Sequence, residues 1–188
     1  DALILLGDLT FNSERISHIE LAAKLDNIVG AGVPVYLIPG NHDINHERCM
    51  GFRGNEVYKV ESVSAKEFQE IYHNCGYAVA EFFDKSSASY VAKLSESLYV
   101  IMLDTNSYSQ NYLGEQALIW LEDVLKEISK PDVHILGVSH QNLLQHNFMF
   151  TEGFMIKNAQ KIEELYKKYN VKLNLSGHMH IQHIEDRG

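Results

Sequence analysis

The sequence predicts an α/β protein in which a mixed-sheet sandwich carries helices on its outer faces. Short apolar runs of the buried-strand type alternate along the chain with segments whose apolar residues recur at helical spacing. Such alternation is typical of domains in which helices cover the faces of a sheet. The 188 residues contain no internal repeat and no proline-rich linker, so we expect one domain over residues 1–188.

The first elements are a strand, a helix and a strand. Residues 2–7 form a short apolar run, and residues 13–31 carry apolar side chains at positions i, i+4, i+7 and i+8. Residues 33–38 form a second apolar run, rich in β-branched residues, that ends at Pro39 and Gly40. Because a helix connects the two strands, we expect them to pair in parallel.

The elements that follow begin with a helical insert over residues 44–76. Ser64 and Glu67 have the spacing of a capping box at the start of its helix. Three consecutive strands come next, with an antiparallel middle pair because so few residues separate them, and two helix–strand units complete the chain. The expected strands are 77–83, 89–94, 98–103, 133–139 and 171–175, and the expected helices cover 118–128, stopped by Pro131, and 162–169.

The charge of the chain bears on its partners. The 25 acidic residues exceed the 16 basic ones and give a net charge of −9, which disfavours a role in binding nucleic acid. A small phosphate substrate remains compatible, because bound cations reverse the local field. The longest apolar run, residues 2–6, is far shorter than the roughly 20 residues of a transmembrane helix. We therefore expect no transmembrane segment here, and the oligomeric state stays open.

Polar residues that can bind metal follow the predicted strands. Asp8 follows the first strand, Asn41 the second, His140 the strand at 133–139, and His178 and His180 the last. Ligands of α/β sheets collect at the carboxyl ends of strands, so these residues are expected to converge. One carboxylate, one amide oxygen and several imidazoles suit Mn, Fe or Zn. Asp8 has two oxygens and is able to bridge two such ions about 3.5–4 Å apart.

His178 and His180 are two positions apart. If the backbone is extended there, the two side chains point to opposite sides and serve different ions. Alternatively, Asp8 and Asn41 hydrogen-bond their own backbone in ordinary turns. The histidines would then be core residues whose hydrogen bonds are satisfied within the protein. Their order at successive strand ends favours the metal site. A contact with substrate stays open for His46 and His146, and no special role is expected for four other histidines, His18, His73, His134 and His183.

Four short motifs, taken in this order, resemble those of the calcineurin-like metallophosphoesterase superfamily. They are Gly7-Asp8, Gly40-Asn41-His42-Asp43, Ser139-His140 and Gly177-His178-Met179-His180. The resemblance covers nearly the whole chain. It implies a metallophosphoesterase-like fold, two divalent or trivalent metal ions, and hydrolysis of a small phosphodiester or phosphomonoester by a metal-bound hydroxide.

The resemblance also implies a role for each matching residue. Asp8 would bridge the ions, Asn41, His140 and His178 would complete one of them, and His180 would belong to the other. His42 would protonate the leaving oxygen or steady the transferring phosphoryl group. Its neighbour Asp43 would orient it.

The sequence also departs from the pattern of the superfamily. The expected Asp-x-His motif does not precede Asp8, so the second ion would keep only Asp8 and His180. Gln141 and Asn142 stand where relatives often have a second histidine or a proline, a change expected at the rim of the site. These departures predict a fragment, truncated at both ends, with one complete metal site. The alternatives are a catalytically degenerate metal-binding scaffold for protein interaction and a natural single-metal protein.

Overall fold

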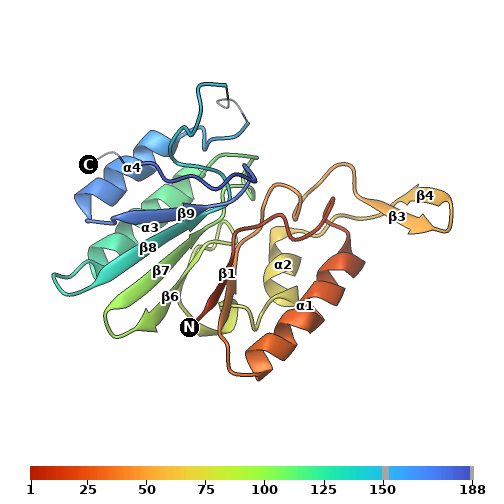
Figure 1. Cartoon of the computed structure of the whole chain (residues 1–188), viewed down its shortest axis with the longest axis horizontal. Coiled ribbons are helices and arrows are strands. Elements are labelled where there is room, and N and C mark those ends of the chain that lie inside the picture. Colours follow the sequence, from red (N-terminus) through yellow and green to blue (C-terminus); the bar gives the residue numbers. More distant parts are fainter. Residues whose placement is uncertain (150–152, 187–188) are drawn as a thin grey trace.

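The computed structural model describes residues 1–149 and 153–186 and shows an α/β sandwich (Figure 1). Helices α1 and α2 cover a small parallel sheet on one side, while α3 and α4 lie against a larger mixed sheet on the other (Figure 1). The predicted mixed-sheet fold with helices on the outer faces is thereby confirmed. Within the described ranges, no helix has the length and apolar character needed to cross a bilayer.

The small sheet is the strand, helix and strand unit expected at the start of the chain. Strand β1 (Leu3–Leu5) pairs in parallel with β2 (Val35–Leu37). Helix α1 (Arg15–Gly30) connects the two and buries His18, Ala22 and Leu25. The predicted parallel pair is confirmed, and both strands end at the same edge of the sheet.

The larger sheet combines antiparallel and parallel pairs. The first three strands pair antiparallel because short turns join them, and the last two add in parallel because a helix precedes each. Along the described chain the strands lie side by side in the order of the sequence. They are β5 (Ala80–Phe83), β6 (Tyr90–Ser95), β7 (Leu98–Leu103), β8 (His134–Ser139) and β9 (Leu173–Ser176), with α3 (Glu115–Ile128) before β8 and α4 (Ala159–Lys168) before β9.

The segment 44–76 contains more than the predicted helix. Helix α2 (Ala65–Ile71) begins at the expected capping box of Ser64 and Glu67. A hairpin of β3 (Met50–Arg53) and β4 (Glu56–Lys59) precedes it and projects from the body of the molecule (Figure 1). The sequence analysis missed this hairpin, whose strands are only four residues long and mostly exposed, although Gly54-Asn55 between them is a typical two-residue hairpin turn. The 3₁₀ turn η1 (Tyr77–Val79) also replaces the first half of the strand expected at 77–83.

Strands β6 and β7 supply both cores of the molecule. Successive side chains of a strand point to opposite faces. Tyr90 and Met102 therefore join the core between the two sheets, while Val91 and Ile101 join the core beneath α3 and α4. All four side chains are fully buried, so the larger sheet fixes both halves of the sandwich.

Tyr90 also joins the two sheets by hydrogen bonds. Its hydroxyl lies 3.1 Å from both the N–H and the C=O of Leu37, so the first group donates to Tyr90 and the second accepts from it. Leu37 is the last residue of β2 and leads into the loop at residues 39–43. One buried side chain of β6 thus holds the strand that carries part of the candidate site.

We predict that Tyr90→Phe lowers the free energy of unfolding by about 1–3 kcal/mol, because two buried backbone groups of Leu37 lose a partner. Urea denaturation measures the change. Tyr108→Phe, at a side chain that is 74% exposed, is the matched control and is expected to be nearly neutral. Equal stability of the Tyr90 variant and the wild type would contradict the proposed link between the sheets.

Candidate metal centre

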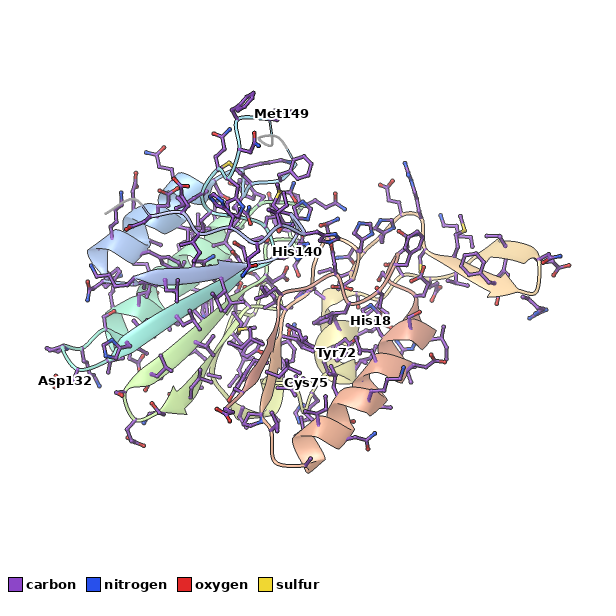
Figure 2. The ribbon with its side chains drawn as sticks, viewed as in Figure 1. His18, Tyr72, Cys75, Asp132, His140 and Met149 are labelled. Atoms are coloured by element: carbon purple, nitrogen blue, oxygen red, sulfur yellow. The ribbon has the colours of Figure 1, made fainter. Side chains whose placement is uncertain are left out.

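The residues expected to bind metal lie where the ends of the two sheets meet. Asp8 follows β1 and Asn41 follows β2, whereas His140 directly follows β8 and His178 follows β9. Figure 2 shows His140 at the junction between the smaller and the larger sheet. The parallel pairing of β1 with β2 and of β8 with β9 therefore brings these four residues to one place, although they are up to 170 positions apart in the sequence.

The ring nitrogen Nε2 of His140 is the centre of the cluster. It lies 3.2 Å from Asp8 Oδ2, 3.1 Å from Asn41 Oδ1 and 3.1 Å from His178 Nδ1. Asp8, His140 and His178 each offer a ligand atom, and these atoms all lie within 4.8 Å of one another. The His140 side chain is 1% exposed and that of Asp8 18% exposed, so His140 is buried while Asp8, like Asn41 and His178, is only partly buried.

Two backbone carbonyls determine which nitrogen of each ring carries a proton. The Leu6 carbonyl lies 2.5 Å from His140 Nδ1, and the Gly153 carbonyl lies 3.0 Å from His178 Nε2. A carbonyl oxygen only accepts, so each of these nitrogens donates. In the neutral rings, His140 Nε2 and His178 Nδ1 therefore hold lone pairs that face one another.

Four electron pairs thus meet with no proton between them. One additional proton on His140 would satisfy at most one of the three neighbouring atoms, whereas a cation would satisfy all of them. The three distances of 3.1–3.2 Å from His140 Nε2 are short enough for the four atoms to share one ion. The set of one carboxylate, one amide oxygen and two imidazoles suits a borderline metal ion.

The electrostatics of the cluster fit the same conclusion. Burial by itself raises the pKa of Asp8, but the adjacent His140 and the N–H of His42 outweigh it and hold this pKa below its usual value. Burial and the neighbouring His140 lower the pKa of His178. An ionised carboxylate and neutral imidazoles are the forms that bind metal.

The backbone of the site adopts strained conformations. Asp8 has φ 54°, His178 φ 62° and His180 φ 52°, all in the left-handed region that costs a non-glycine residue about 1–2 kcal/mol. The backbone at His178 and His180 is therefore not extended, so the expectation that an extended strand points the two side chains to opposite sides was wrong. His178 turns into the cluster, whereas the side chain of His180 is exposed and lies outside it.

His42 lies beside the cluster. Its backbone N–H donates to Asp8 Oδ1 at 3.2 Å, and its ring Nδ1 donates to the Phe11 carbonyl at 2.7 Å. The ring is therefore held by a backbone group. Its other nitrogen, Nε2, is left facing outward from that anchor.

Asp43 does not contact the ring of His42 as the resemblance implied. Its buried carboxylate accepts hydrogen bonds from the N–H groups of Leu9, Thr10 and Gly40 at 2.8, 2.9 and 2.8 Å. These bonds join the loop after β1 to the loop after β2. Asp43 thereby positions the backbone of His42, and the orientation of the ring comes from the Phe11 carbonyl instead.

The pair Gln141 and Asn142 also differs from expectation. Both side chains are buried, at 0% and 1% exposure, so neither forms a rim of the site. Gln141 Nε2 donates to Asn106 Oδ1 at 2.8 Å, and its Oε1 accepts from the Thr105 hydroxyl. Gln141 therefore braces the ends of β7 and β8 from inside the protein.

Sequence reasoning missed the groups that orient the candidate ligands. They are the carbonyls of Leu6, Phe11 and Gly153, and a backbone carbonyl leaves no signal in a sequence. It also gave no special role to His18, which is fully buried. His18 Nε2 donates to the Asp43 carbonyl at 2.8 Å, and its Nδ1 lies 2.9 Å from the Tyr72 hydroxyl.

An α/β sandwich with a mixed nitrogen–oxygen cluster at its strand ends is the arrangement expected of metal-dependent phosphoesterases. The family model described as calcineurin-like phosphoesterase matches residues 1–182, and the chain belongs to this family. The predicted resemblance is thereby confirmed.

A solved structure supports the same fold. A dimetal phosphatase from Danio rerio is similar over 95% of this chain with a TM-score of 0.65 and 14% identity. The alignment covers 66% of that phosphatase, so the chain spans less than two thirds of its length. A search of curated proteins gives no match.

We predict that Gly40→Ala weakens manganese binding about 10–100-fold, the usual effect of disturbing groups around a metal ligand. A Cβ at Gly40 would fall against Asp8 Oδ1 and lie 2.9 Å from His140 Cε1. Isothermal titration with manganese measures the effect. Gly30→Ala is the control, because its added Cβ meets nothing within 4 Å. Equal affinities for the two variants would argue against a site between Asp8 and His140.

Proposed function

We propose that this chain binds metal ions at the cluster and uses them to hydrolyse a phosphoester. The observation that carries the proposal is the meeting of Asp8, Asn41, His140 and His178 around one point, where the lone pairs of the neutral rings face the two oxygens. The membership of the chain in the calcineurin-like phosphoesterase family supports the reaction class. The ions proposed are divalent or trivalent manganese, iron or zinc.

The proposed ligands divide between two ions. Asn41, His140 and His178 would hold one ion together with Asp8, and Asp8 has a second oxygen with which to bridge to another. His180 is proposed for that second ion. Its exposed position outside the cluster makes this the more weakly supplied of the two sites.

Metal ions bound here would supply positive charge for the phosphoryl group and would lower the pKa of a bound water to about 7. The residues of the chain would do the rest. Asp8 and the imidazoles fix where the charge lies. Fixed charge of this kind stabilises a phosphoryl group as its own charge develops.

His42 is the proposed partner of the leaving oxygen. Its Nδ1 is occupied by the Phe11 carbonyl and its backbone N–H by Asp8, so Nε2 remains for the substrate. A proton on Nε2 would pass to the departing oxygen or hydrogen-bond to the phosphoryl group. Asp43 acts as a positioning residue, since its carboxylate fixes the loop that carries His42.

The proposed substrate is a small phosphodiester or phosphomonoester. The net charge of −9 opposes the long phosphate backbone of a nucleic acid, which proteins bind through many cationic side chains. A small ester needs only the local charge of the metal centre.

A metal-binding scaffold for protein interaction is the second candidate. The exposed His180 favours this candidate. If only the first ion is held firmly, the chain binds metal but lacks the pair of ions that phosphoester hydrolysis commonly uses. The two candidates differ in one result: a scaffold binds manganese without turning over a phosphoester.

We predict that the chain hydrolyses bis-p-nitrophenyl phosphate when manganese is added. Asp8→Asn should lower turnover by more than about 100-fold, since even an outer-shell change costs about 10–100-fold in affinity or activity. Release of nitrophenolate measures the rate. Asp132→Asn is the control, at an exposed residue far from His140 (Figure 2). Manganese binding by the wild type without turnover would favour the scaffold.

We also predict that His42→Ala binds manganese as the wild type does but loses about 10²–10⁴-fold in turnover, the usual contribution of a positioned acid or base. Its backbone N–H still donates to Asp8, so the ligands keep their places. Metal titration and nitrophenolate release are measured on the same sample. Unchanged turnover would remove His42 from the reaction.

A further inference from the structure

A second histidine lies against His42. The ring of His46 stacks on that of His42 with centroids 5.3 Å apart and planes at 20°. His46 lies in the loop after β2, ahead of the projecting hairpin, and is partly buried. Stacked rings are common in proteins, so the stacking by itself assigns no role to His46.

The backbone around His46 is fastened on both sides. The N–H of His46 donates to the Ser62 hydroxyl at 2.7 Å, and the preceding N–H, of Asn45, donates to the Val63 carbonyl at 2.9 Å. Asn45 takes a left-handed conformation with φ 50°. The Ser62 hydroxyl donates in turn to that of Ser13, so the turn is tied to the loop after β1.

The protons of the two rings are set by their anchors. The N–H of Arg48 donates to His46 Nδ1 at 3.2 Å, so the neutral ring of His46 carries its proton on Nε2. Burial and the neighbouring His42 and Arg48 lower the pKa of His46, which keeps the ring neutral. In the described part of the chain, no protein group hydrogen-bonds to Nε2 of His42 or of His46. Both rings therefore present a free nitrogen edge.

The stacking brings His46 next to the proposed proton donor. The ring of His46 lies next to that of His42, with centroids 5.3 Å apart, so a leaving group that contacts the free edge of His42 would also lie beside His46. A shallow pocket lined by His46, Lys59 and Ser62 adjoins the pair and leaves room for that leaving group. Glu47 and Glu61 also line the pocket, which therefore suits an uncharged leaving group better than a second phosphate.

We propose that His46 is a catalytic residue that hydrogen-bonds through Nε2–H to the leaving oxygen beside His42. This inference rests on the proposed phosphoester hydrolysis. As the bond from phosphorus to the leaving oxygen breaks and the bond to the oxygen of water forms, a His42 ring that carries a proton on Nε2 as well as on Nδ1 gives the Nε2 proton to the leaving oxygen, while its Nδ1 proton stays hydrogen-bonded to the Phe11 carbonyl. His46 keeps its own proton and stabilises the negative charge that builds up before that transfer.

Two substitutions separate this role from a purely structural one. His46→Asn keeps an acceptor for the Arg48 N–H but removes the distal donor, whereas His46→Gln keeps a distal donor and gives up the Arg48 anchor. A contact with the leaving oxygen predicts a damaged Asn variant and a largely active Gln variant. A structural role predicts the reverse. His134→Asn, at an exposed residue that begins β8, is the control.

The experiment compares kcat and KM of the manganese-loaded chain and its variants on bis-p-nitrophenyl phosphate and on diphenyl phosphate. His46→Asn should lower kcat about tenfold or more with little change in KM, because the lost bond forms mainly in the transition state. The loss should be larger for diphenyl phosphate, whose poorer leaving group carries more charge. Inhibition by inorganic phosphate, which has no leaving group, should be unchanged.

The possible failures are distinguishable. An inactive wild type overturns the proposed hydrolysis, and this inference with it. An active wild type whose His46→Asn variant matches it, or whose Asn and Gln variants lose activity equally, overturns the role of His46 alone. Weaker inhibition of the Asn variant by inorganic phosphate would place any contact on the transferred phosphoryl group and would likewise overturn the assignment to the leaving oxygen.

Discussion

The meeting of lone pairs at His140 Nε2 is the constraint on which the rest of the structure depends. Asp8, Asn41 and His178 each bring an electron-rich atom within 3.2 Å of this nitrogen. Such atoms repel one another unless a cation or a proton lies between them, and buried electron-rich groups without a partner are costly. The surrounding protein must therefore hold them in place. The two sheets do so because the parallel pairs β1–β2 and β8–β9 both end beside the cluster.

Backbone groups, rather than other side chains, keep the candidate ligands oriented. The Leu6 carbonyl fixes the ring of His140, the Gly153 carbonyl that of His178, and the Phe11 carbonyl that of His42. Each bond selects the ring nitrogen that faces the site. A histidine that binds metal through one nitrogen usually donates a hydrogen bond from the other. The hydrogen bonds of these rings therefore agree with a metal site.

The loops that carry the site are tied to one another before any metal is considered. Asp43 joins the loops after β1 and β2 through backbone N–H groups, and Ser13 donates to the Asp43 carbonyl at 2.7 Å. His18 then links that same carbonyl to Tyr72. This network offsets the left-handed strain at Asp8 and gives His42 and His46 fixed places. Strained residues persist at functional sites only where such surroundings hold them.

The sequence by itself determined the α/β class, the parallel pair β1–β2, the antiparallel pair β6–β7 and the polar residues at the strand ends, because apolar periodicity and turn residues are local properties. It did not give the exposed hairpin β3–β4, because strands of four mostly exposed residues carry little apolar signal. Only the tertiary structure decided that Asp43 binds backbone, that Gln141 is buried, and that His180 lies outside the cluster. The protonation of each ring was likewise decided there, since it depends on carbonyls as distant in sequence as Leu6 is from His140.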